Sequence, residues 1–178
     1  NVLNNYLSKH RVFPDWLNAA PAHNLLIAVV IPVHNEPEIL PTLEALANCE
    51  STNGKVEVIL VINASEKASE KVKQQNLNIA QTIKVFVANY SGKLDFHIIL
   101  NNELPQKHAG VGLARKMGMD EAVSRFAKIN QEKGIIVCFD ADCTCASNYL
   151  IEIEKAFEKY APKAMSIRFE HPLSGVEY

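Results

Sequence analysis

The sequence predicts an α/β protein: a single three-layer α/β/α domain in which helices cover both faces of a mostly parallel sheet. Three observations predict this class. Apolar runs rich in β-branched residues alternate with segments of helical periodicity. The runs are apolar at consecutive positions, as expected of strands buried on both faces. Several of them end abruptly in polar residues, which is typical of strand–helix–strand units in a parallel sheet.

Length and composition are those of one folded globular domain. The chain has 178 residues, of which 48% are hydrophobic and 21% charged. A formal net charge of -2 gives no indication of nucleic-acid binding. No apolar run reaches the roughly 18 residues that a membrane-spanning helix needs, and no signal peptide is visible. We expect a cytoplasmic protein, either free or peripheral at the inner face of a membrane that segments outside this sequence would contact.

The chain begins with an amphipathic arm over residues 1–24, in which Pro14 and Pro21 limit any helix. Its apolar residues are spread among polar neighbours: Leu3, Tyr6, Leu7, Val12, Phe13, Trp16 and Leu17. Such an arm either lies on the domain or forms half of an interface with another chain. We place the domain itself at residues 25–178.

The first strand is predicted over residues 25–33, with Pro32 near its end, where the missing N–H does least harm. Apolar residues at helical spacing predict a helix over residues 38–48, and a second apolar run predicts a strand over residues 56–62. This order is the first strand–helix–strand unit of the parallel sheet.

The middle of the chain is less regular. Residues 65–80 are polar with scattered apolar positions and predict a solvated helix. Two short apolar runs follow at residues 83–87 and 96–100, and the polar segment 101–108 is predicted to be a loop.

The last third of the chain contains the most regular helix, predicted over residues 109–127 from apolar residues on one side. It leads into a buried strand at residues 135–139. A further helix is predicted over residues 149–160 and a further strand over residues 164–169.

Three of the predicted strands are followed by polar residues: His34, Asn35 and Glu36; Asn63 and Ser65; Asp140 and Asp142. The carboxyl ends of parallel strands border the ligand crevice of an open sheet, so we expect a crevice that suits a nucleotide. Asp140 and Asp142 are hard oxygen donors that could hold Mg²⁺ or Mn²⁺ and, through it, a phosphate. The alternative is that Asp-Ala-Asp is a polar turn that caps the next helix.

The four cysteines favour no zinc site. Cys143 and Cys145 form a Cys-x-Cys pair without a nearby His or a second cysteine pair, whereas structural zinc takes four N or S donors in paired spacing. Cys138 lies inside an apolar run and is predicted to be a small core residue. Free thiols in this number, Cys49 included, fit a reducing compartment.

Four motifs resemble, in order and spacing, the family 2 glycosyltransferases of the GT-A fold, a Rossmann-like nucleotide-binding fold. The motifs are Ala28-Val-Val-Ile-Pro-Val-His-Asn-Glu36, Val61-Ile-Asn-Ala-Ser65, Gly110-Val-Gly-Leu-Ala-Arg-Lys-Met-Gly118 and Phe139-Asp-Ala-Asp142. The resemblance spans about residues 25–170. It implies transfer of a sugar from a nucleoside-diphosphate sugar to a hydroxyl of a saccharide or lipid-linked acceptor, as in the synthesis of cell-envelope polysaccharides.

The resemblance also implies a nucleotide site made of Pro32, Val33, Glu36, Asn63, Ser65, His108 and Asp140. In this site Asn63 would contact the base, Asp140 would face the ribose or the waters of a Mg²⁺ or Mn²⁺ ion, and Asp142 would be the metal ligand. The sequence departs from the family pattern at two places. Asn63 stands where members commonly have Asp, which leaves the base preference open, and Arg115-Lys116 replaces the usual Arg-Asn.

The catalytic base is not assigned. Enzymes of this family carry a carboxylate base and an acceptor-binding surface after the middle of the sheet, whereas this sequence ends at Tyr178. Glu170 and Glu177 are present, but neither lies in a context that marks the base. We therefore expect the chain to be the donor-binding part of a longer protein, with the acceptor part missing.

Other classes remain open on the sequence. A nicotinamide-dependent enzyme would need Gly-x-Gly-x-x-Gly after the first strand, where this chain has Val33-His-Asn-Glu-Pro37. A nucleotidyltransferase would also use a metal held by Asp, but with a Gly-rich, basic loop after its first strand. A binding module without catalytic activity is the third alternative.

Overall fold

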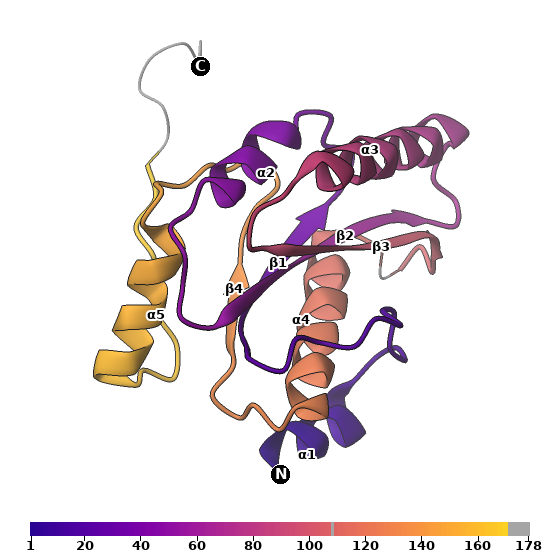
Figure 1. Cartoon of the computed structure of the whole chain (residues 1–178). Helices are drawn as coiled ribbons and strands as arrows, with labels where there is room; N and C mark the ends of the chain where they lie inside the picture. Colours follow the sequence, from indigo (N-terminus) through magenta and orange to yellow (C-terminus); the bar gives the residue numbers. More distant parts are fainter. Residues whose placement is uncertain (108, 171–178) are drawn as a thin grey trace.

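A computed structural model describes residues 1–107 and 109–170 of the chain. These residues contain a four-stranded sheet in the order β3-β2-β1-β4, and every neighbouring pair is parallel (Figure 1). The strands are β1 (Leu25–Val33), β2 (Lys55–Ser65), β3 (Asp95–Leu104) and β4 (Ile135–Cys138). The helices are α1 (Val2–His10), α2 (Leu40–Ala47), α3 (Glu70–Asn89), α4 (Val111–Lys128) and α5 (Tyr149–Tyr160). The α/β class and the parallel sheet are thus confirmed.

The strand order explains why helices cover both faces. From β1 the chain moves outward to β2 and then β3, and from β3 it returns past β1 to β4. Crossovers between parallel strands are right-handed, so the reversal of direction puts α2 and α3 on one face and α4 on the other (Figure 1). The chain leaves β1 in one direction across the sheet and reaches β4 on its other side. The carboxyl ends of β1 and β4 therefore form a topological switch point.

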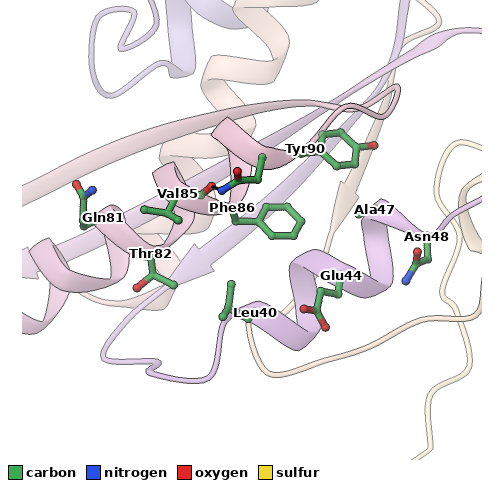
Figure 2. Close-up of a pocket in the computed structure, with 10 residues that line it drawn as sticks. Leu40, Glu44, Ala47, Asn48, Gln81, Thr82, Val85, Phe86 and Tyr90 are labelled. Atoms are coloured by element: carbon green, nitrogen blue, oxygen red, sulfur yellow. Dashed lines mark hydrogen bonds between the residues drawn. The ribbon is translucent and has the colours of Figure 1, made fainter.

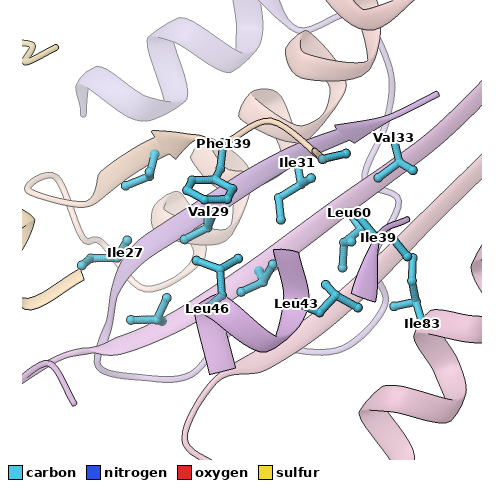
Figure 3. Packing of buried hydrophobic residues seen from close by; sticks show 14 of the residues in the cluster. Ile27, Val29, Ile31, Val33, Ile39, Leu43, Leu46, Leu60, Ile83 and Phe139 are labelled. Atoms are coloured by element: carbon cyan, nitrogen blue, oxygen red, sulfur yellow. The ribbon is translucent and has the colours of Figure 1, made fainter. Parts of the chain in front are cut away.

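Alternation along β1 divides its side chains between two cores. Ile27, Val29 and Ile31 pack against α2 and α3, where Figure 3 shows them beside Leu43 and Leu46. The intervening side chains of β1 pack on the opposite face, against α4. Because both faces are covered, β1 has to be apolar at almost every position, as its sequence is.

The glycine at position 118 allows α4 to lie directly on the sheet. A Cβ atom at Gly118 would come within 2.4 Å of Val30 Cγ1 and 3.1 Å of Val61 Cγ2. The contact therefore holds only with glycine, unless the helix moves away from β1 and β2.

The N-terminal arm lies on α4 (Figure 1). Its main-chain N–H groups donate to buried carboxylates: Val12 N to Asp120 Oδ2 at 3.2 Å, and Trp16 N to Glu121 Oε2 at 2.8 Å. Buried acidic groups need such partners, so the outer side of α4 is polar and yet covered. Desolvation raises the pKa of Glu121.

No helix in the part of the chain that the structure describes is long and apolar enough to cross a membrane.

Residues 83–87, an apolar run to which the sequence assigned no element, continue α3, because Ile79 and Ile83 lie one helical turn apart and both face the sheet. Three predictions about the secondary structure and the core were wrong. Residues 101–104 are not part of a loop but continue β3, because they pair with the end of β2, with Asn101 opposite Asn63. Residues 164–169 are exposed and form no strand, since no neighbouring strand lies beside them in the described structure. Cys138 is exposed rather than in the core, because its side chain points to the opposite face of β4 from the buried Val137.

Candidate functional site

The three polar strand ends lie side by side at the carboxyl edge of the sheet. Strand β1 is the neighbour of both β2 and β4, with Val33 opposite Ile62 and Val30 opposite Cys138. The residues after β1 and β4 therefore flank the switch point, and the end of β2 lies next to them. Open parallel sheets bind their ligands at this position.

Asp140 and Asp142 point into solvent because their neighbours are held in the core. Phe139 and Ala141 are buried, and the Phe139 ring packs edge-on against Tyr149, with ring centroids 5.5 Å apart. Asp140 and Asp142 alternate with these residues and are exposed. Helix α5 has Asn148 at its N-cap, so neither aspartate caps that helix. The turn is real, since Cys143 N donates to Asp140 O at 3.2 Å, but the helix-cap interpretation is wrong.

Arg115 of α4 pairs with one of the two carboxylates. Its Nη2 lies 2.8 Å from Asp140 Oδ1, and both side chains are partly exposed. Asp142 has no ion-pair partner among the described residues. Its Oδ1 accepts only a weak bond from the Cys143 thiol, with 3.7 Å between the sulfur and the oxygen. Asp142 is therefore the carboxylate with more free coordinating capacity.

Thr42 of α2 fixes the main chain on both sides of Asp142. Its buried Oγ1 lies 2.7 Å from Ala141 O and 2.9 Å from Cys143 O, so its single proton is shared between the two carbonyls. Thr42 was not among the predicted site residues. No local signal identifies it, because Thr42 looks like an ordinary helical position and its partners are about 100 residues away in the chain.

The loop after β1 is connected to the end of β2. His34 Nδ1 lies 3.2 Å from Asn63 O, and because a carbonyl can only accept, His34 carries its proton on Nδ1. Glu36 Oε1 accepts from Glu38 N at 3.2 Å. Pro32 and Val33 are buried in the sheet, so they form the floor of this edge.

Asn63 joins the end of β2 to the start of α4. Its side chain is fully buried, and Nδ2 donates to Gly110 O at 3.1 Å. Its Oδ1 is buried and has no hydrogen-bond partner among the described residues. Ser65, at the end of the same strand, accepts from Lys67 N through Oγ at 3.1 Å.

Changing Asn63 to Asp is expected to lower the free energy of unfolding by about 1–3 kcal/mol, because the Gly110 carbonyl loses its donor and a carboxylate is buried beside it. Urea unfolding followed by circular dichroism measures the change. Asn101→Asp is the matched control, since Asn101 pairs with Asn63 in the sheet and its Oδ1 only accepts, from Glu103 N at 2.8 Å. Equal stability of the Asn63→Asp and Asn101→Asp proteins would contradict the role of the Gly110 bond.

Three further residues were considered for the site. His108 and Glu177 lie outside the described residues. Glu170 is exposed and pairs with Arg168. The described His, Cys, Asp and Glu side chains form no group of three or more that could hold a metal ion. Among the side chains that could take part in metal binding, Asp140 and Asp142 are two exposed carboxylates that follow β4.

A groove with a volume of about 670 Å³ lies elsewhere, between α2 and α3 (Figure 2). Leu40 of α2, Val85 and Phe86 of α3, and Tyr90, which follows α3, give it a largely apolar lining. The groove contains none of the strand-end residues. We place the candidate site at the strand ends because hydrogen-bonding groups converge there.

Comparison with known proteins assigns the chain to a family. The family model described as Glycosyl transferase family 2 matches residues 28–171, which include all three strand ends. Comparison with curated protein sequences gave no match. Similar solved structures are S. aureus TarS 1-349 in complex with UDP, at 16% identity and a TM-score of 0.48, and in complex with UDP-GlcNAc, at 18% and 0.46.

Both alignments with TarS cover 77% of this chain, and they cover 33% and 32% of the TarS chains. The chain thus spans about a third of the length of these relatives. The match of the family model extends over most of the sequence, from the middle of β1 to beyond α5. The chain belongs to glycosyl transferase family 2.

Proposed function

We propose that this chain is the donor-binding part of a glycosyltransferase, which moves a sugar from a nucleoside-diphosphate sugar to an acceptor hydroxyl. One observation carries the proposal: the polar ends of β2, β1 and β4 lie side by side at the switch point of a parallel sheet. All three ends fall within the residues that match glycosyl transferase family 2.

The nucleoside would bind over the ends of β1 and β2. We propose that it is bordered by Pro32, Val33, Glu36, Asn63, Ser65, His108 and Asp140. The unpartnered Oδ1 of Asn63 supports a base contact, because a buried acceptor without a donor is costly and an N–H of a base would satisfy it. Because Asn63 is fully buried, this contact would require the groups that cover its Oδ1 to move when the nucleotide binds, while Nδ2 remains bonded to Gly110.

The diphosphate would lie toward β4, near Asp140, Asp142 and Arg115. We propose that Asp142, with Asp140, holds Mg²⁺ or Mn²⁺. The donor set fits, because Mg²⁺ is commonly bound by one or two carboxylates together with substrate phosphates and water. When bound, such an ion acts as a Lewis acid toward the diphosphate leaving group. Arg115 would keep Asp140 oriented through their ion pair and add a positive charge beside the phosphates.

The acceptor hydroxyl has to lose a proton to a base during transfer. Glu170, the candidate that the structure describes, is exposed and paired with Arg168, and we assign the base to no residue. We propose a saccharide or lipid-linked acceptor, of the kind used for cell-envelope polysaccharides, and a cytoplasmic location at or near the inner face of a membrane.

The test is isothermal titration of the protein with uridine, guanosine and cytidine diphosphates, each with and without Mn²⁺. We expect one of the three to bind, and to bind more tightly with Mn²⁺. Absence of binding by all three, under both conditions, would refute the proposed donor site. Tighter binding of a nucleoside triphosphate, together with release of pyrophosphate, would favour a nucleotidyltransferase instead.

A further inference from the structure

Two cysteines from distant parts of the chain meet where the β4–α5 loop contacts the end of α2. Cys49 follows α2, and Cys145 lies in the loop that also carries Asp140 and Asp142. Their Sγ atoms are 3.7 Å apart, although 96 positions separate the two residues in the sequence. Both are free thiols and both are partly exposed, so a small molecule can reach them.

The main chain already holds these two segments together. Glu50 N, next to Cys49, donates to Ser147 O at 2.7 Å. A disulfide needs a sulfur–sulfur distance of about 2.0 Å, so the two sulfur atoms have to approach by about 1.7 Å. Rotation of the two side chains about their Cα–Cβ bonds can supply much of this distance, with the two segments remaining in contact.

The chemistry of the pair is asymmetric. The hydrogen bond from the Cys145 thiol lowers the pKa of Cys49 to about 7, and the same bond raises the pKa of Cys145. Cys49 is therefore the thiol of the pair that ionises at lower pH, and the thiolate is the nucleophilic form. The raised pKa of Cys145 makes it the second thiol to react.

We propose that Cys49 and Cys145 are a redox-active pair that forms a reversible disulfide, with a low-molecular-weight disulfide as the oxidant. The Cys49 thiolate attacks one sulfur of the oxidant, which forms a mixed disulfide and releases one thiolate. Cys145 then loses its proton to solvent and attacks Cys49 Sγ, which releases the second thiolate. Two protein thiols are oxidised and one disulfide is reduced to two thiols. The assignment does not depend on the proposed transferase function.

Once formed, the bond would tie the end of α2 to the loop that carries Asp140 and Asp142. Thr42 already holds the start of this loop on the same helix. In the oxidised protein the β4–α5 loop would therefore be attached to α2 near both ends of that helix.

The test is disulfide mapping of the reduced protein after incubation in buffers with increasing ratios of oxidised to reduced glutathione. Remaining thiols are alkylated and the peptides are identified by mass spectrometry. We expect a cross-linked Cys49–Cys145 peptide pair, lost when dithiothreitol is added. A Cys143–Cys145 link in its place, or glutathione adducts without any protein disulfide, would overturn the proposal. This measurement on the unaltered chain needs no variant to fold.

Cysteine variants test which thiols form the cross-link. Cys49→Ser and Cys145→Ser are expected to abolish the cross-link, whereas Cys138→Ser and Cys143→Ser retain it as matched controls. The rate of Cys49 alkylation by iodoacetamide should be half-maximal near pH 7 in the unaltered protein and closer to pH 9 in Cys145→Ala, because the hydrogen bond is lost. An alkylation midpoint of Cys49 that does not respond to Cys145→Ala would overturn the assigned pairing.

Discussion

Replacing Arg125 with Met is expected to lower the free energy of unfolding by about 3–5 kcal/mol. Arg125 and Glu57 are both fully buried between α4 and β2. The guanidinium bonds both carboxylate oxygens of Glu57, with Nη2 2.8 Å from Oε1, and its Nη1 donates to Ala19 O of the arm at 2.8 Å. Without Arg125, the Glu57 carboxylate stays buried and loses its counter-charge.

His97 is the neighbouring residue best placed to replace part of that charge, since its Nε2 lies 3.8 Å from Glu57 Oε2. Burial, the largest cause that lowers the pKa of His97, remains in the Arg125→Met protein, whereas the further lowering by Arg125 is lost. The main-chain N–H of Ala22 donates to Glu57 Oε1 at 3.3 Å and is a single neutral donor. We therefore expect most of the cost of the unpaired, buried carboxylate to appear as a lower free energy of unfolding.

Urea unfolding at pH 7 measures the effect, with Lys128→Met as the matched control. Lys128 lies one turn further along α4 and pairs with Asp15 at 3.1 Å, but both side chains are exposed, so its loss should cost no more than about 1 kcal/mol. The double change of Arg125 and Glu57 to Met should recover much of the loss, because no buried charge remains. An Arg125→Met protein as stable as Lys128→Met would refute the buried pair as a source of stability.

Replacing Asp142 with Ala is expected to weaken metal-dependent nucleotide binding by about 10²-fold or more, since losing a direct ligand costs at least as much as losing a residue that orients one. The stability should change by less than about 0.5 kcal/mol, because the side chain is exposed at the end of a strand. Isothermal titration with a nucleoside diphosphate, with and without Mn²⁺, measures the first effect, and urea unfolding measures the second.

Asp95→Ala is the matched control for Asp142→Ala. Asp95 is an aspartate at the opposite, amino end of β3, where it pairs with Lys55 at 3.1 Å. Its replacement should leave nucleotide binding unchanged. If Asp142→Ala binds as tightly as Asp95→Ala and keeps its response to Mn²⁺, Asp142 is not the metal ligand.

The sequence by itself determined the architecture. Strands buried on both faces of a parallel sheet have to be apolar at consecutive positions, and β1 and most of β2 have this composition. Parallel neighbours also need a crossover between them, which the alternation of apolar runs and helical segments supplies. Because the carboxyl ends of parallel strands lie at one edge of the sheet, the sequence also predicted that the residues after β1 and β4 would share this edge with Asn63. The order of the strands came only from the structure.

The secondary structure of short apolar runs was decided only by the tertiary structure. The run at residues 83–87 fits a strand or a buried helical turn equally well, because five residues are too few to distinguish the two periods. Because Ile83 packs against the sheet, residues 83–87 are part of α3. The exposure of Cys138 was likewise decided by the face of β4 to which its side chain points.

Contacts between residues that are distant in the chain could not be predicted from the sequence either. Arg125 and Glu57 are 68 positions apart, Thr42 and Ala141 are 99 apart, and Cys49 and Cys145 are 96 apart. Each of these residues looks ordinary in its local segment, since a periodic pattern reports only which side of one element is buried. Which polar groups meet across that buried surface depends on how α2, α4 and the β4–α5 loop pack against the sheet, and only the folded chain fixes that packing.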